Sequence, residues 1–168
     1  VSDQSDFEQI IWEFEHKEEG QPLFLFNVTI QNHGSYTVKD YSAQVQLADQ
    51  PGKYPMAEQY LTLANKTDEA FKTLVDYFSQ CDEPTIIVMF GDHQPSVEQE
   101  FLDKAYGVTQ DQMTMEQYMD KFRVPFVIWA NYDIPEAEGV ELSLNYLSAL
   151  LMDTANLPMT GYQKYLAR

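Results

Sequence analysis

The sequence has few basic residues, one cysteine and no long hydrophobic run. Its 168 residues include 10 Lys and Arg against 27 Asp and Glu, a formal net charge of −17. We therefore expect no nucleic-acid partner, because binding of that kind depends on neutralising phosphates. The single Cys81 excludes an internal disulfide and fits no cysteine metal pattern. No stretch approaches the roughly eighteen consecutive apolar residues of a membrane span, so we expect a soluble chain.

The composition is that of a globular protein, with 44% hydrophobic and 14% aromatic residues. Apolar runs alternate with segments of helical periodicity, and the runs lack the polar alternation of a half-exposed strand. This pattern predicts an α/β sandwich with a mostly parallel sheet and helices on both faces. We expect helices at 6–19, 56–80, 97–105, 115–122 and 142–155, strands at 23–30, 86–90 and 124–130, and a short strand in 43–49.

Polar residues follow two of the predicted strands at their carboxyl ends. Gly91, Asp92 and His93 follow "TIIVMF", and His33 follows "FNVTIQN". Ligands of open α/β sheets bind outside the carboxyl ends of parallel strands, so these side chains should share one sheet edge. A glycine permits a sharp turn there, and an adjacent carboxylate and imidazole suit a divalent metal. Two alternatives stay open: Asp92 caps the next helix, and His33 is an ordinary loop histidine with one backbone hydrogen bond.

Several other notable residues fit a structural role better than a functional one. His16 lies near the predicted end of the first helix, where a partly charged imidazole is mildly favourable. Aromatic and long apolar side chains at helical or strand spacing are predicted to be core. These are Trp12, Phe24, Phe26, Phe71, Phe78, Trp129 and Met152.

Five stretches together resemble a known family. They read, in order, "FLFNVTIQNHGSYT", "YLTLANKTDEAFKTLVDYF", "TIIVMFGDHQP", "VPFVIWAN" and "LSLNYLSALLMDTANLPMTGYQKYL". They are similar to the carboxyl-terminal half of the lipoteichoic acid synthase family, which are phosphoglycerol transferases of the sulfatase and alkaline phosphatase superfamily. The resemblance implies that residues 1–168 are the carboxyl-terminal portion of one sulfatase-like catalytic domain. It implies a partial alkaline phosphatase-like sandwich whose amino-terminal strands are missing.

The resemblance also implies roles for three residues. Asp92 and His93 would ligate a divalent metal, Mn²⁺ in the synthases and Mg²⁺, Ca²⁺ or Zn²⁺ elsewhere in the superfamily. His33 would donate hydrogen bonds to the phosphoryl oxygens of the substrate. These residue types suit the chemistry, because a metal polarises a phosphoryl oxygen and an imidazole stabilises developing negative charge.

A complete enzyme of this family needs further residues upstream, namely an acidic metal ligand and a Thr or Ser nucleophile. The hydroxyls of Thr29, Thr37 and Thr85 match none of these positions. We therefore expect the isolated chain to be inactive and to bind metal weakly. Strand edges without their neighbours would favour self-association.

The resemblance suggests that the parent is a membrane-anchored enzyme of the cell envelope, acting at the extracytoplasmic face of the membrane. It would move glycerol phosphate from phosphatidylglycerol to a glycolipid or growing polymer, as in lipoteichoic acid synthesis. One alternative is a hydrolase of sulfate or phosphate esters, which a formylglycine-type cysteine motif would favour; Cys81 is not in such a motif. Another is a non-catalytic α/β module that binds a partner.

Overall fold

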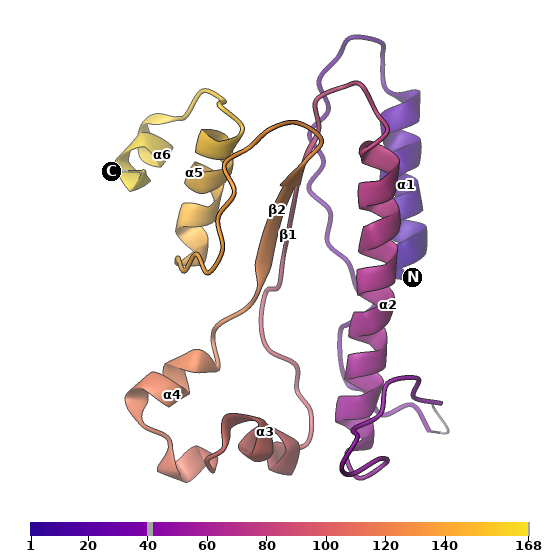
Figure 1. Cartoon of the computed structure of the whole chain (residues 1–168), viewed down its shortest axis with the longest axis vertical. Helices are drawn as coiled ribbons and strands as arrows, with labels where there is room; N and C mark the ends of the chain where they lie inside the picture. The colour runs from indigo at the N-terminus through magenta and orange to yellow at the C-terminus, as the bar shows by residue number, and fades with distance from the viewer. Residues whose placement is uncertain (40–41, 168) are drawn as a thin grey trace. The chain divides into compact units, whose positions relative to one another are not determined.

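Helices dominate the part of the chain that the structure describes, and two short strands form its sheet (Figure 1). The computed structural model describes residues 1–39 and 42–167. The α/β class predicted from the sequence is confirmed, and none of the helices in this described part is long and apolar enough to cross a membrane. In chain order the elements are α1 (Asp3–His16), α2 (Pro55–Phe78), β1 (Ile86–Phe90), α3 (Gln99–Tyr106), the 3₁₀ helix η1 (Gln110–Gln112), α4 (Met115–Asp120), β2 (Phe126–Ala130), α5 (Leu144–Thr154) and α6 (Gly161–Leu166).

The chain divides into two compact units. The first unit combines Val1–Tyr77 with Asp92–Val124, and the second combines Phe78–Gly91 with Pro125–Arg168. Most of α2, together with α1, α3 and α4, belongs to the first unit, whereas both strands, α5 and α6 belong to the second.

Local sequence signals explain where α1 begins and ends. The side chain of Ser2 caps the helix by accepting a hydrogen bond from the backbone N of Ser5 at 3.2 Å. Acidic Asp3 and Asp6 lie in the first turn and His16 in the last, which complements the helix dipole. The exposed His16 ring stacks on Trp12 with centroids 4.2 Å apart, in agreement with the structural role predicted for it.

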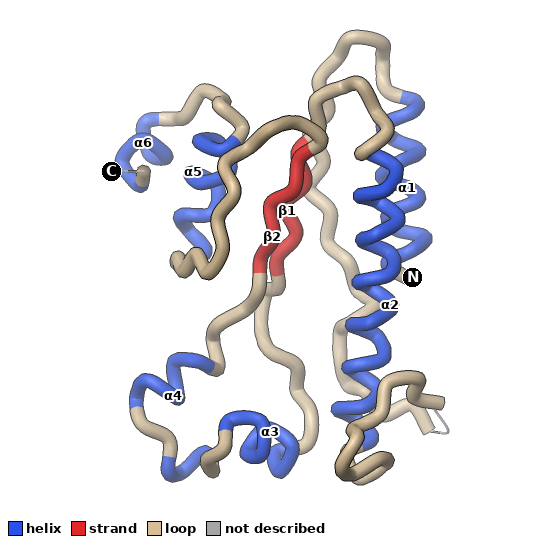
Figure 2. The backbone as a smooth tube through the Cα atoms, in the orientation of Figure 1, coloured by secondary structure: helices blue, strands red, loops and turns tan. Residues whose placement is uncertain are grey.

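The run 23–30, predicted to be a buried strand, is an unpaired and exposed segment instead. All its residues are exposed, and Phe24 and Phe26 reach 82% and 73%. Figure 2 shows it as part of the loop between α1 and α2, and 43–49 is likewise a loop. A strand requires a hydrogen-bonding neighbour, and among the described residues none pairs with this run. The predicted burial of Phe24 and Phe26 is therefore wrong for this structure.

The two strands of the second unit pair antiparallel, whereas the sequence predicted a parallel sheet. Ile86 lies opposite Ala130, and Phe90 lies opposite Phe126. The prediction of parallel pairing is therefore wrong for these two strands. An unbroken apolar run indicates burial on both faces of a strand but carries no information about the direction of its neighbour. Asn131 clamps the end of the sheet, since its Oδ1 accepts from the Thr85 backbone N at 2.7 Å.

The remaining core predictions have mixed outcomes. Phe78 is buried at 4% exposure. Phe71, Trp129 and Met152 are only partly buried, and Trp12 is 48% exposed, with its ring stacked on His16 of the same helix.

A hydrophobic cluster at the start of α2 organises the first unit. Its buried members are Tyr36, Tyr54, Ala57 and Val97, which come from three separate parts of the sequence. Glu98 extends this junction, because its carboxylate accepts from the backbone N of Met56 at 2.8 Å and of Ala57 at 3.0 Å. The cluster therefore ties the segment after β1 to the amino-terminal end of α2.

Candidate functional site

Asp92 and His93 form an exposed turn directly after β1. The backbone N of His93 donates to Asp92 Oδ1 at 2.9 Å, and His93 Nε2 lies 3.6 Å from Asp92 Oδ2. The two side chains are 83% and 69% exposed, respectively. Both groups are therefore adjacent and open to an incoming ion or ligand.

The hydrogen bonding of His93 sets which ring nitrogen can bind a metal. Its Nδ1 lies 2.8 Å from the carbonyl oxygen of Gln94. A carbonyl only accepts, so Nδ1 carries the proton and Nε2 of the neutral ring keeps its lone pair. Metal-bound histidines commonly donate their other ring N–H to a backbone carbonyl in this way.

The spacing of the pair fits a shared ion. Two ligands at about 2.1 Å from a tetrahedral metal lie about 3.4 Å apart, close to the separation of Asp92 Oδ2 and His93 Nε2. A carboxylate and an imidazole suit divalent metals such as Mn²⁺. Within residues 1–39 and 42–167, no cluster of three or more His, Cys, Asp or Glu side chains could hold a metal. The pair is thus an open, two-ligand arrangement.

The segment that follows the pair is anchored at three successive points. The side-chain amide of Gln94 donates to the carbonyl oxygen of Arg123. Val97 is buried in the hydrophobic cluster, and the Glu98 carboxylate caps α2. These anchors limit how far Asp92 and His93 can move within the first unit.

His33 ends a turn that begins at Ile30. Its backbone N donates to Ile30 O at 3.1 Å, and its Nδ1 lies 2.8 Å from Gly34 O. The side chain is exposed, and no described residue bonds its Nε2. The backbone hydrogen bond of the loop-histidine alternative is present, yet Nε2 can still reach a ligand.

Tyr36 relates the His33 turn to Asp92. Burial raises the pKa of the Tyr36 hydroxyl above its usual value, and the charges of Tyr60 and Asp92 raise this pKa further. Asp92 is therefore within electrostatic reach of a side chain three residues from His33. The structure brings Asp92 and His93 together, and it records no contact of either with His33 among the described residues.

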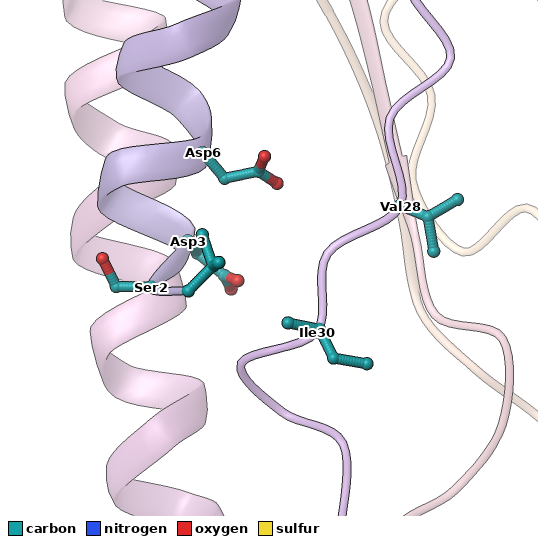
Figure 3. A pocket seen from close by; sticks show the side chains of 6 residues that line it. Ser2, Asp3, Asp6, Val28 and Ile30 are labelled. Carbon is teal, nitrogen blue, oxygen red and sulfur yellow. The ribbon is translucent and has the colours of Figure 1, made fainter.

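A separate cavity lies between the start of α1 and the exposed segment (Figure 3). Its volume is about 140 Å³, and Figure 3 shows Asp6 directed across it toward the segment that carries Val28 and Ile30. Asp3 and Asp6 give it an acidic lining that disfavours an anionic ester. None of the predicted site residues lines this cavity, so the candidate site remains the Asp92–His93 turn.

Sequence reasoning missed Tyr36 and Glu98. Tyr36 stands inside the quoted motif "NHGSYT", but an aromatic in a loop gives no sign of where its ring packs. Glu98 precedes α3 and looks like an ordinary acidic residue at a helix start, although its partners Met56 and Ala57 belong to another helix.

Comparisons with known proteins agree with the resemblance read from the motifs. A Rhizobium meliloti (strain 1021) protein named for the modification of cyclic beta-1,2-glucan is 28% identical over 176 aligned residues, covering 100% of this chain and 27% of that protein. The structure of Streptococcus pyogenes phosphoglycerol transferase GacH in complex with sn-glycerol-1-phosphate superposes with a TM-score of 0.72 at 17% identity. That match covers 99% of this chain and 40% of the GacH chain.

The chain thus spans about a quarter of the length of the Rhizobium meliloti protein and two fifths of the GacH chain. The structural likeness confirms a partial alkaline phosphatase-like fold. The family model described as Sulfatase matches residues 1–157. With nearly its whole length matched, the chain belongs to the sulfatase family, and its resemblance to the lipoteichoic acid synthase-like members of that superfamily is confirmed.

Proposed function

We propose that residues 1–168 are the carboxyl-terminal portion of a catalytic domain that transfers phosphoglycerol to a carbohydrate acceptor. The observation that carries this proposal is the Asp92–His93 pair, with Nε2 of His93 oriented as a metal ligand. Membership of the sulfatase family and the fold shared with a phosphoglycerol transferase bound to sn-glycerol-1-phosphate support it. The superfamily generally uses divalent metals.

In this proposal Asp92 and His93 hold one divalent ion, with Mn²⁺ as the best candidate. The bound ion would polarise a phosphoryl oxygen of the donor and offset the chain's charge of −17, which otherwise repels an anionic substrate. His33 donates to a phosphoryl oxygen through Nε2 when its ring is charged, because Nδ1 is already engaged by Gly34 O. The nucleophile belongs to the remainder of the domain, so the isolated chain is inactive.

The donor proposed is phosphatidylglycerol, met at the extracytoplasmic face of the cell membrane. The acceptor class is argued from two sources. The lipoteichoic acid synthase family, which the sequence motifs resemble, extends a glycolipid-linked polymer, and the Rhizobium meliloti relative is named for glucan modification. Both acceptors are carbohydrates or polyols that offer a hydroxyl group. We therefore propose a hydroxyl of a glycolipid, a growing polymer or a glucan as the acceptor.

A second candidate is hydrolysis of a sulfate or phosphate ester. The family description itself favours this alternative, since it names sulfatases. The two functions share the metal pair and differ in what receives the transferred group, water in the hydrolase and a carbohydrate hydroxyl in the transferase.

The test uses the longer parent protein with phosphatidylglycerol, Mn²⁺ and either cyclic β-1,2-glucan or no acceptor. Released diacylglycerol and phosphoglycerol-modified glucan are measured together. Asp92→Ala and His93→Ala should abolish both signals, whereas His16→Ala, which removes an exposed histidine on α1, should leave them intact.

Modified glucan formed by the parent would support the transferase. Free glycerol phosphate without modified acceptor would favour the hydrolase. Unchanged release in the Asp92 and His93 variants would refute the role of the pair.

A further inference from the structure

We propose that Tyr36 is a positioning residue that fixes His33 relative to the Asp92–His93 pair. The inference rests on the proposed metal site, and it assigns a role to a residue that does not itself touch the metal. Four features of the first unit support it, one from the backbone, one from the hydroxyl, one from the ring and one from the far end of the turn.

The backbone of Tyr36 is left-handed, with φ of +49°. A bulky residue adopts this conformation rarely, and it persists only where the surroundings impose it. The Tyr36 hydroxyl supplies part of that constraint, because it donates to the carbonyl oxygen of Asn32 at 2.5 Å. The hydrogen bond closes a turn from Asn32 to Tyr36, and His33 lies inside this turn.

Gly34 allows the ring of Tyr36 to fold against its own turn. A Cβ at Gly34 would lie 3.3 Å from Cε2 of Tyr36, which is tighter than ordinary van der Waals contact. Glycine at this position therefore permits the close approach that the hydroxyl bond needs.

The ring of Tyr36 is fixed to the same cluster as the segment that carries the metal pair. Tyr36 is only 7% exposed and packs with Ala57 and Val97. Its ring also meets Tyr60 edge to face, with centroids 5.6 Å apart. Val97 follows Asp92 closely in sequence, so one buried contact couples the His33 turn to the turn that holds the pair.

The other end of the turn is fixed to α2 as well. Asn32 Nδ2 donates to Thr67 Oγ1 at 2.8 Å, and Gln31 Nε2 donates to the same oxygen at 3.1 Å. Thr67 and Tyr60 are seven residues apart on α2 and therefore share one helix face. Both ends of the turn are thus held along one side of a rigid helix, and His33 has little freedom between them.

Electrostatics agree with this geometry. The charge of Asp92 contributes to the raised pKa of the Tyr36 hydroxyl, after the larger effects of burial and Tyr60. The pKa of the Tyr36 hydroxyl thus responds to the charge of Asp92, although the hydroxyl itself donates to the Asn32 carbonyl oxygen.

The test is a titration of this chain with Mn²⁺, followed by NMR of its histidine imidazoles. Mn²⁺ is paramagnetic and broadens nearby resonances, so it reports proximity to the metal without requiring catalysis. Tyr36→Phe removes only the hydroxyl. The loss of its hydrogen bond should raise the ratio of open to closed conformations of the turn about fivefold. Tyr54→Phe is the matched control, because its ring is buried in the same cluster but its hydroxyl bonds Glu100.

In the wild-type chain and in the Tyr54 variant, Mn²⁺ should broaden both His93 and His33. In the Tyr36 variant, the broadening of His93 should persist and that of His33 should fall several-fold. Equal broadening of His33 in all three chains would overturn the positioning role.

The two proposals fail in different ways. A wild-type chain in which Mn²⁺ leaves His93 sharp would overturn the metal site itself. In that case the NMR chemical shifts of the His33 imidazole, measured without metal, test the role of Tyr36. Identical chemical shifts in the wild-type and Tyr36→Phe chains would overturn the positioning role.

Discussion

Replacing Glu98 with alanine should destabilise the first unit, because this carboxylate caps α2 from a distant part of the chain. Glu98 Oε1 accepts from the Met56 backbone N at 2.8 Å, and Oε2 accepts from the Ala57 backbone N at 3.0 Å. Both donors lie in the first turn of α2, where backbone N–H groups have no partner within the helix. The negative charge also complements the positive end of the helix dipole.

The expected loss in the free energy of unfolding on Glu98→Ala follows from these two hydrogen bonds. A hydrogen bond to a charged group contributes more than a neutral one, but Glu98 is only partly buried and water can replace it at the helix end. Loss of a capping side chain costs up to about 2 kcal/mol, so we expect about 2 kcal/mol for Glu98→Ala. Glu98→Gln keeps one acceptor oxygen and should cost about half as much.

Urea unfolding followed by far-UV circular dichroism measures this cost. With a denaturant dependence of about 2 kcal/mol per molar urea, the midpoint should fall by about 1 M for Glu98→Ala. Glu69→Ala is the control, since it changes an exposed glutamate on the same helix and should shift stability by less than about 0.5 kcal/mol. Equal midpoints for the two variants would refute the capping role of Glu98.

Three further predictions concern other parts of the chain. We expect the isolated chain to self-associate through its exposed segment, and lysine at both Phe24 and Phe26 should abolish this association. Sedimentation velocity over a range of concentrations would measure the association, and a wild-type chain that stays monomeric would contradict the prediction. Asn131→Ala should cost about 3 kcal/mol in urea unfolding, because the Asn131 side chain accepts from the Thr85 backbone N and shares its two amide hydrogens among the carbonyl oxygens of Phe78, Cys81 and Glu83. The raised pKa of Tyr36 means that its stabilising contribution is complete below about pH 10 and is lost as pH rises through the folded-state pKa. Alkaline urea midpoints should therefore fall more steeply for the wild-type chain than for Tyr36→Phe, and parallel curves would contradict this.

Helix positions can be predicted well because their signals are local. The periodicity that predicts a helix at 56–80 corresponds to α2 at Pro55–Phe78, and the acidic helix expected at 6–19 is α1 at Asp3–His16. The early start of α1 depends on the cap provided by Ser2, which is a single-residue effect. No helix is expected near the carboxyl end, although Thr160 forms a capping box with Gln163 that begins α6.

The fate of the apolar runs cannot be predicted in this way, because it depends on neighbours elsewhere in the chain. Ile86–Phe90 finds a partner strand in Phe126–Ala130, whereas 23–30 has a similar composition and finds none among the described residues. Such runs do not specify pairing direction either, which is why the sequence favours a parallel sheet where an antiparallel pair forms.

The candidate site shows the same division. Asp92 and His93 are adjacent in sequence, so a shared role can be inferred from the sequence alone. The packing of Tyr36 and Glu98 cannot be inferred, because both residues contact α2, which lies far from each of them in the sequence. Sequence motifs therefore suggest candidate site residues, and the structure adds the residues that pack around them.

The most direct test of the account is Mn²⁺ binding by this chain, measured by electron paramagnetic resonance. We expect weak binding, because two protein ligands make an incomplete site. Asp92→Asn and His93→Gln should each abolish this binding, whereas His16→Gln should retain it. Wild-type affinity in the Asp92 and His93 variants would contradict the claim that this pair is the metal site.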